Sequence, residues 1–252
     1  MFFEMYVRSK ALGKSTQLNV LLPNDLEGAV PPYKTLWLLH GLSGDHASWM
    51  RNTLIERYAL KYHLAVVMPN ADRSWYTNTA YGVNYFDYVT EELPEICRST
   101  FKNLSEKRED NIVAGLSMGG YGALKSALTL PERYGTCISL SGSLDVTRKG
   151  RQCNLEEWRS LFGFDMKSPL ELEGSKHDLF ALAEKAKKEG KLFPKLYLWC
   201  GLDDSCLSGN QALDKHLTDL SVEHTFKTSE GDHSWYYWNV HMQNALDWAL
   251  DD

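Results

Sequence analysis

A serine flanked by glycines is the feature of this sequence with the clearest chemical meaning. Four glycines lie close to Ser117 in "VAGLSMGGYGALKSAL": Gly115, Gly119, Gly120 and Gly122. The apolar residues 111–114 predict a short buried strand before the serine, and residues 121–130 predict a helix after it. A nucleophile on a sharp strand-to-helix turn needs small neighbours, because the turn brings the flanking residues together. We therefore expect Ser117 to be a nucleophile in a strained backbone conformation, with a glycine-rich turn of no catalytic consequence as the alternative.

A serine hydroxyl is a weak nucleophile, so this prediction requires a base elsewhere in the chain. His233, in "SEGDHSWYYW", lies between the last predicted strand and the last predicted helix, where loops gather at the carboxyl edge of a parallel sheet. Five other histidines are better explained as structural or surface residues: His63, His177, His216, His224 and His241. We expect His233 to be the base, with a hydrogen-bonded loop histidine as the alternative.

The base in turn needs an acid that orients it, and the expected chain order is serine, acid, histidine. Two adjacent aspartates follow a predicted strand in "KLYLWCGLDDSC". Counting G-x-x-D from Gly201 favours Asp204, and Asp203 would then be solvated or cap the turn. Asp232 adjoins His233 but points elsewhere in an extended loop, so it is a poor partner.

An oxyanion hole is the remaining requirement, since each of its donors typically contributes about 10²–10³ in rate. The turn "LLHGLSGDHASW" follows an early strand and offers the N–H of Leu42, and the second donor is the N–H of Met118. His40 is expected to hold this loop by hydrogen bonds. His40, Asp45 and His46 match no strong metal-ligand spacing, so we expect no metal site.

Aromatic residues are frequent on the segments expected near Ser117, and such walls suit compact apolar or phenyl-bearing acyl groups. The candidate pocket residues are Trp49, Trp75, Tyr76, Tyr81 and Trp235. We expect at least two of them to fill the core instead. No long amphipathic lid is evident, which argues against a lipase that acts at a triglyceride interface.

The elements that must position these residues alternate along the chain. Five short apolar runs end in turn residues, as parallel strands covered on both faces do: "TLWLLHG", "LAVVMPN", "NIVAGLS", "TCISLSG" and "KLYLWCG". Residues 18–22 predict an earlier strand, with "MFFEMYVRS" as its antiparallel neighbour. The intervening helices are expected over residues 49–62, 84–100, 118–130, 209–220 and 235–250. This order predicts an α/β fold with a mostly parallel sheet covered by helices on both faces.

Length and composition suit one α/β domain over residues 1–252, since a chain that is 43% hydrophobic can bury a large core. The charged, irregular segment 143–191 is expected to be a small cap or surface excursion. A formal charge of −6 gives nucleic acid and anionic membranes no electrostatic reason to bind. The start "MFFEMYVRSK" lacks the features of a signal peptide, and the five cysteines form no C-x-x-C pair. We therefore expect a cytoplasmic protein whose partner is a diffusible small molecule.

Taken together, these motifs resemble those of a known family. The sequence is similar to the esterase D-like branch of the α/β hydrolases, in particular to bacterial tributyrin esterases and related feruloyl and acetyl esterases. The resemblance covers essentially the whole chain and rests on "LLHGLSGDHASWM", "SWYTNTAYGVNYFDYVTEELP", "AGLSMGGYGAL", "LWCGLDD" and "GDHSWYYW". It implies an α/β-hydrolase fold and a serine esterase that needs no cofactor. Relatives are often oligomeric, so the resemblance also implies a homo-oligomer.

The resemblance carries three residues as a catalytic triad: Ser117, Asp204 and His233. It carries Leu42 and Met118 as the oxyanion donors. The sequence departs from the family where many relatives have an aromatic residue directly after the acid, because Ser205 stands there. We expect a serine carboxylesterase that hydrolyses short-chain acyl or aryl esters through an acyl-enzyme intermediate. The alternatives are an S-formylglutathione hydrolase and a non-catalytic binding protein with a hydrolase fold.

Overall fold

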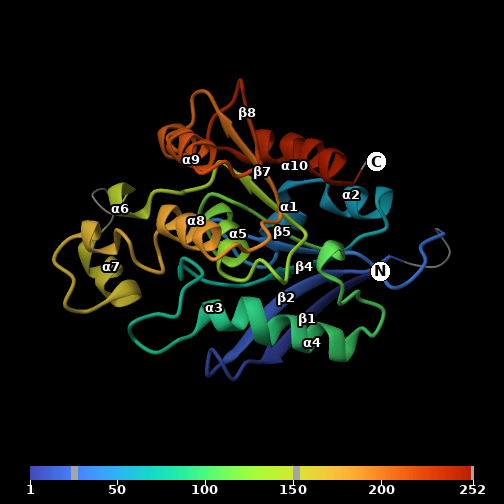
Figure 1. Cartoon of the computed structure of the whole chain (residues 1–252). Helices are drawn as coiled ribbons and strands as arrows, with labels where there is room; N and C mark the ends of the chain where they lie inside the picture. Colours follow the sequence, from blue (N-terminus) through green and yellow to red (C-terminus); the bar gives the residue numbers. More distant parts are fainter. Residues whose placement is uncertain (24–27, 150–153, 251–252) are drawn as a thin grey trace.

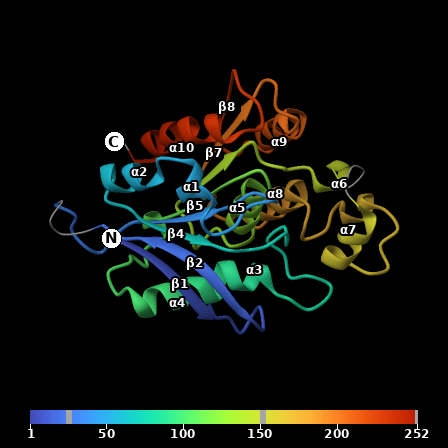
Figure 2. The ribbon, with the colours of Figure 1, turned by 180° about the vertical axis from the view of Figure 1, so that it is seen from behind.

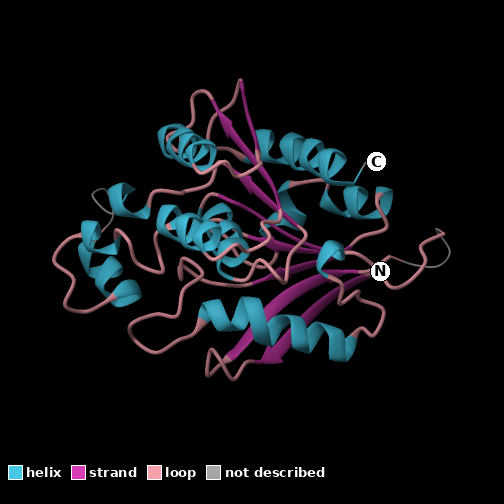
Figure 3. Ribbon diagram, in the orientation of Figure 1, coloured by secondary structure: helices cyan, strands magenta, loops and turns pink. Residues whose placement is uncertain are grey.

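The computed structural model describes residues 1–23, 28–149 and 154–250, and its centre is a mixed sheet of eight strands (Figures 1 and 3). The strands are β1 (Phe2–Arg8), β2 (Ser15–Leu21), β3 (Thr35–Leu39), β4 (Ala65–Pro69), β5 (Asn111–Leu116), β6 (Thr136–Leu140), β7 (Lys195–Gly201) and β8 (Thr225–Ser229). Their order across the sheet is β1-β2-β4-β3-β5-β6-β7-β8. β1 pairs antiparallel with β2 and β2 with β4, while all pairs from β4 to β8 are parallel. The predicted α/β-hydrolase sheet, with its antiparallel N-terminal strand, is confirmed.

The central strands β3, β4, β5 and β6 are buried at every position and are largely apolar, because both of their faces are covered. In β3, Leu36 and Leu38 pack into one core, whereas Trp37 and Leu39 pack into the core on the opposite face. Successive side chains of a strand point to opposite faces, so a run without polar residues fills two cores at once. This is why the strand segments read as continuous apolar runs.

Helices cover both faces, as the two opposite views show (Figures 1 and 2). One face carries α1 (Ser48–Asn52), α2 (Ile55–Lys61) and α10 (Trp235–Leu250). The other carries α3 (Tyr85–Asp87), α4 (Leu93–Thr100), α5 (Met118–Thr129), α8 (Leu179–Lys188) and α9 (Leu207–Asp219). None of the helices in the described ranges is long and apolar enough to cross a membrane.

The expected helix over residues 49–62 is broken in two, which corrects the sequence analysis. Thr53 is extended, and its hydroxyl donates to the carbonyl of Trp49 at 2.6 Å and accepts from the N–H of Ile55 at 3.3 Å. A threonine side chain that competes for backbone groups in this way ends one helix and starts the next.

The expected helix over residues 84–100 exists, but it contains a π-helical turn at Tyr88–Glu92. Pro94 has no N–H and therefore cannot donate to the carbonyl of Thr90 four residues earlier. The guanidinium of Arg133 donates to that carbonyl instead.

The segment expected to be a cap contains α6 (Val146–Lys149), α7 (Leu155–Phe162), a 3₁₀ turn (Pro169–Leu172) and α8. Its residues 150–153, with Cys153, lie outside the described ranges. α6 and α7 extend beyond the sheet at one end of the molecule, whereas α8 packs against α5 (Figure 1). The ring of Trp158 on α7 meets the ring of Trp75 edge to face at 5.0 Å. The segment therefore joins the main core through aromatic contacts.

Candidate active site

Ser117 lies on the turn between β5 and α5, with φ 53° and ψ −118°. A side chain at this positive φ costs on the order of 1–3 kcal/mol and persists only where the surroundings enforce it. The strained conformation expected for the serine is present. The turn leaves its side chain only partly buried, beside the first N–H groups of α5.

The flanking glycines are required by close backbone contacts. A Cβ on Gly115 would come within 2.3 Å of the carbonyl oxygen of Gly119, and a Cβ on Gly119 would come within 2.4 Å of the carbonyl oxygen of Leu39. The expected close approach of the residues on either side of the serine is confirmed. Gly122 makes a different close contact, because a Cβ there would meet the ring of Tyr76 at 2.4 Å.

The structure brings His233 and Asp204 to Ser117, although they follow it by 116 and 87 residues in the chain. The Nε2 atom of His233 is 2.9 Å from the Oγ of Ser117. The Nδ1 atom of the same ring is 3.0 Å and 2.9 Å from the two carboxylate oxygens of Asp204. Asp203 and Asp232 are both exposed, so Asp204 is the aspartate that meets the imidazole.

The charges of this cluster are coupled. Burial lowers the pKa of His233, but hydrogen bonds with Asp204 and Cys206 outweigh burial and raise that pKa to about 9. Burial also raises the pKa of Asp204, but the hydrogen bonds that its carboxylate accepts hold that pKa below its usual range. Asp204 is therefore a carboxylate that favours a positive charge on the imidazole.

Two backbone N–H groups next to Ser117 in the fold have no acceptor within the described part of the chain. Among the described residues, none accepts a hydrogen bond from the N–H of Leu42 or from the N–H of Met118. A Cβ on Gly41 would come within 3.5 Å of the Cβ of Ser117, so the turn that carries Leu42 lies directly against the serine. The pair is available to a negatively charged oxygen bound beside Ser117.

Three residues that support Asp204 and Ser117 were missed in the sequence. The hydroxyl of Ser141 helps to lower the pKa of Asp204 and accepts from the indole N–H of Trp238 at 2.9 Å. The N–H of Cys206 donates to Asp204 at 2.7 Å. Ser143 lies with its Oγ 3.5 Å from the Oγ of Ser117. The sequence did contain a signal for Ser141 and Ser143. Both serines directly follow the strand "TCISL", so they lie just beyond the carboxyl end of β6.

The aromatic candidates occupy different environments. Trp49 is fully buried and its indole N–H donates to the carbonyl of Leu39 at 3.0 Å, while Trp75 is almost fully buried. Trp235 is partly buried and meets the ring of Trp49 edge to face at 5.3 Å, whereas Tyr81 is exposed. The rings of Trp49 and Trp75 therefore belong to the core. This agrees with the expectation that at least two of the five aromatic candidates fill the core.

Tyr76 is the fifth aromatic candidate, and it too is fully buried. Its hydroxyl donates to the carbonyl of His40 at 2.8 Å. His40 holds its loop as expected, because its Nδ1 donates to the Gly41 carbonyl at 2.7 Å and its Nε2 accepts from the N–H of Ala71 at 2.9 Å. With both ring nitrogens engaged, His40 has no lone pair to offer a metal together with Asp45 and His46.

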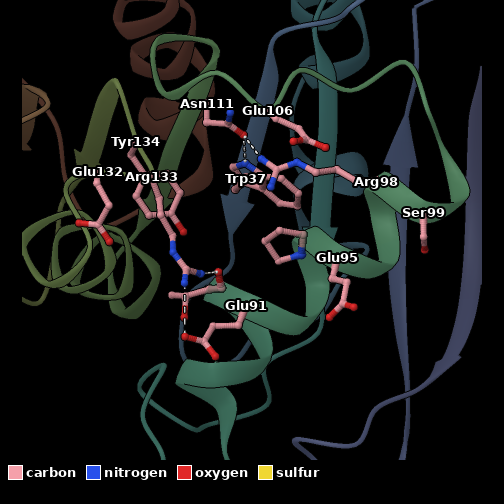
Figure 4. Close-up of a pocket in the computed structure, with 12 residues that line it drawn as sticks. Trp37, Glu91, Glu95, Arg98, Ser99, Glu106, Asn111, Glu132, Arg133 and Tyr134 are labelled. Atoms are coloured by element: carbon pink, nitrogen blue, oxygen red, sulfur yellow. Dashed lines mark hydrogen bonds and ion pairs between the residues drawn. The ribbon is translucent and has the colours of Figure 1, made fainter.

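A polar groove of about 580 Å³ lies at the opposite edge of the sheet, where β5 and β6 begin (Figure 4). Arg98 lies over the ring of Trp37 and donates to the amide oxygen of Asn111 at 3.1 Å. Arg133 pairs with Glu91 at 3.4 Å. The groove holds four glutamates (Glu91, Glu95, Glu106 and Glu132) beside the two arginines.

The fold and the arrangement around Ser117 define an α/β hydrolase of the serine type, and the comparisons with known proteins agree. The family model "Esterase" matches residues 9–249. The acetyl esterase of Caldicellulosiruptor saccharolyticus is 32% identical, over 95% of this chain and 94% of that protein. The chain belongs to the esterase family and is a serine hydrolase that acts on carboxylic esters.

Two solved structures from Staphylococcus aureus cover almost the whole chain. The fluorophosphonate-binding serine hydrolase FphF, with substrate bound, has a TM-score of 0.93 and 36% identity, over 100% of this chain and 99% of that chain. An S-formylglutathione hydrolase has a TM-score of 0.89 and 36% identity, over 99% of this chain and 98% of that chain. The family therefore includes proteins named for oxygen esters and for a thioester.

Proposed function

We propose that the chain hydrolyses esters of short acyl groups, with Ser117 as nucleophile, His233 as general base and Asp204 as the acid that orients the base. The observation that carries this proposal is the continuous hydrogen-bond chain, with 2.9 Å from Ser117 Oγ to His233 Nε2 and 2.9 Å from His233 Nδ1 to Asp204. This is the geometry that a serine hydroxyl needs to lose its proton as it attacks.

The reaction has two halves. Ser117 Oγ attacks the ester carbonyl as its proton passes to His233 Nε2, and the N–H groups of Leu42 and Met118 stabilise the oxyanion. The intermediate collapses to an acyl-serine, and the departing alcohol takes the proton from His233. Water then attacks the acyl-serine through the same base, and the carboxylic acid leaves. Asp204 stays ionised throughout and stabilises the imidazolium that forms in each half.

The size of the acyl group follows from the rings near His233. The ring of Trp238 meets the His233 ring edge to face at 4.8 Å, and Trp235 packs on both Trp238 and Trp49. Rings packed against one another in this way resist displacement. A methylene of the acyl chain that contacts them gains about 0.8 kcal/mol, whereas a methylene that extends beyond them must distort the packing. Ser205, which replaces the aromatic residue of many relatives, is exposed and leaves one side open. We propose an optimum at short chains, near butyrate.

The test is kcat/KM on p-nitrophenyl esters from acetate to laurate. The expected profile rises over the first few carbons and then falls. A maximum at decanoate or longer, with activation at a lipid interface, would overturn the short-chain proposal and make the segment 143–191 a mobile lid.

A thioester is the second candidate substrate, because a solved S-formylglutathione hydrolase is 36% identical to this chain. The same triad cleaves either bond, so the test is a direct comparison of kcat/KM for S-formylglutathione and p-nitrophenyl butyrate. A higher value for the thioester would assign the chain to that reaction. The homo-oligomer and the cytoplasmic location remain predictions from the sequence.

A further inference from the structure

A thiol lies beside the histidine of the proposed triad. The Sγ of Cys206 is 3.8 Å from the Nδ1 of His233, the ring nitrogen that also faces Asp204. One ligand atom from each of these three residues lies within 4.8 Å of the other two. In the described part of the chain, this is the one group of at least three His, Cys, Asp or Glu side chains that meets this distance. The thiol transfers no proton in the esterase reaction and does not set the short-chain specificity, although its contact helps to raise the pKa of His233.

We propose that Cys206, His233 and Asp204 form a binding site for a thiophilic divalent cation such as Cd²⁺ or Zn²⁺, and that an ion bound there switches the esterase off. A thiolate, an imidazole and a carboxylate are ligands that these ions prefer over the oxygen-only sets that suit Mg²⁺.

The distances suit a tetrahedral ion. With bonds of about 2.3 Å to sulfur and about 2.0–2.2 Å to nitrogen and oxygen, neighbouring ligand atoms lie about 3.3 Å apart for N and O and about 3.6 Å apart for N and S. The distances here are 2.9 Å between His233 Nδ1 and Asp204 and 3.8 Å between His233 Nδ1 and the Cys206 Sγ. Movements of a few tenths of an ångström close these two differences. The third pair, the Cys206 Sγ and the Asp204 oxygen, lies within 4.8 Å and must approach to about 3.6 Å.

The carboxylate of the site is already oriented, and one of the three ligands reaches the surface. The Oδ1 atom of Asp204 accepts the N–H of Cys206 at 2.7 Å, and its two oxygens lie 3.0 Å and 2.9 Å from the Nδ1 of His233, which fixes the carboxylate plane. Water can supply the fourth ligand, and so can the hydroxyl of Ser143, whose Oγ is 3.7 Å from the thiol. Cys206 is buried whereas His233 is exposed, so we expect the ion to enter from the side of His233.

Binding is balanced in charge and protons. The thiol proton of Cys206 leaves to solvent. An imidazolium ring, the form that the raised pKa of His233 favours at neutral pH, also loses its Nδ1 proton to solvent, whereas a neutral ring moves that proton to Nε2. One dication with one thiolate, one carboxylate and one neutral imidazole carries no net charge, which suits a buried site.

The proton on Nε2 then prevents the ring from accepting the proton of Ser117. Because the ion lies on the far side of the ring from Ser117, kcat falls while KM changes little. This effect on turnover rests on the proposed role of His233, whereas the binding of the ion does not.

The experiment titrates Cd²⁺ against ester hydrolysis in the wild-type chain, in Cys206→Ser and in Cys97→Ala. Cys97 is a buried thiol on α4, so its variant is the matched control that also lacks one thiol. We expect equal inhibition of the wild type and Cys97→Ala, mainly through kcat, and at least an ~100-fold higher half-inhibitory concentration for Cys206→Ser. Mg²⁺ at the same concentrations should not inhibit.

Binding is measured separately by the ultraviolet Cd–thiolate charge-transfer band in Ser117→Ala, which needs no activity. The band should grow to one equivalent of Cd²⁺ and vanish in Ser117→Ala/Cys206→Ser, with circular dichroism to show that the double variant is folded. Unchanged Cd²⁺ sensitivity of Cys206→Ser, or a band that survives the loss of Cys206, would overturn the site. A band that depends on Cys206, without any loss of turnover in the wild type, would overturn the switch.

Discussion

The two edges of the sheet hold carboxylates in contrasting ways. At the carboxyl edge, the side chain of Asp204 has no exposed surface and its charged partner is the imidazole of His233. At the amino edge, Glu91 is 58% exposed and pairs with Arg133, which is itself partly exposed (Figure 4). An ion pair as exposed as Arg133–Glu91 is screened by solvent and contributes little.

At the carboxyl edge, the positive charge that would balance Asp204 appears fully only when His233 takes a proton. Burial makes that coupling strong, because the attraction between the carboxylate and the imidazolium is weakly screened away from water. A large number of charged residues in a groove therefore does not make that groove the better candidate for catalysis. A small cluster is at least as good a candidate when its positive charge forms during the reaction.

The largest expected effect is at the carboxyl edge. Ser117→Ala and His233→Ala should each lower kcat/KM by about 10⁴-fold or more, because members of a triad act as a unit. Circular dichroism and thermal melting should show that both variants stay folded. Near-normal hydrolysis by either folded variant would contradict the catalytic role of the carboxyl edge. The two edges of the sheet would then not differ in function.

The adjacent aspartates give a sharper test within one turn. Asp204→Asn should lower kcat by roughly 10³–10⁴-fold, because an amide does not hold the imidazole in the required tautomer. Asp203→Asn is the matched control, since Asp203 is exposed and its backbone N–H, which the substitution keeps, donates to the carbonyl of Gly231 at 2.9 Å. The opposite order of the two variants would assign the acid to Asp203.

The pH dependence follows from the raised pKa of His233. Catalysis needs the neutral ring, so kcat/KM should fall as the pH drops through that pKa, which lies above the ordinary 6.5 and toward 9. Asp204→Asn removes a hydrogen bond that raises the pKa, so the residual activity of that variant should titrate at lower pH. The profile is measured with a chelator present. A wild-type midpoint below 6.5 would contradict the coupling between His233 and Asp204.

The smallest effect is expected at the amino edge. Arg98→Ala removes a hydrogen bond to Asn111 and the contact over Trp37, but it should leave kcat/KM unchanged. The lost contacts should cost about 1 kcal/mol, or about 2–4 °C in Tm for a chain of this length. A large fall in kcat/KM at unchanged stability would show that the groove takes part in the reaction.

Local constraints explain what the sequence predicted well. The strand before Ser117, the helix after it and the need for Gly115 and Gly119 all arise within one short segment. The α/β-hydrolase sheet follows from apolar runs whose burial on two faces leaves a direct mark on composition.

Contacts between distant segments explain what the sequence did not predict. The π-helical turn depends on Pro94, which is local, and on Arg133, which is not. Ser141 reaches Asp204 only because β6 and β7 are neighbours in the sheet. Trp75 is buried by Trp158 from α7, and no pattern around Trp75 indicates that contact.

The most direct measurement of the central claim is the site of covalent labelling by a fluorophosphonate. The wild-type chain, Ser117→Ala and Ser143→Ala are treated with the probe, and the adduct is located by peptide mass spectrometry. Ser143 is the matched control because its hydroxyl lies 3.5 Å from that of Ser117. We predict one adduct, on Ser117, in the wild type and in Ser143→Ala, and none in Ser117→Ala. An adduct on Ser143 or on any other serine of the wild type, or none at all, would contradict the assignment of Ser117 as the nucleophile.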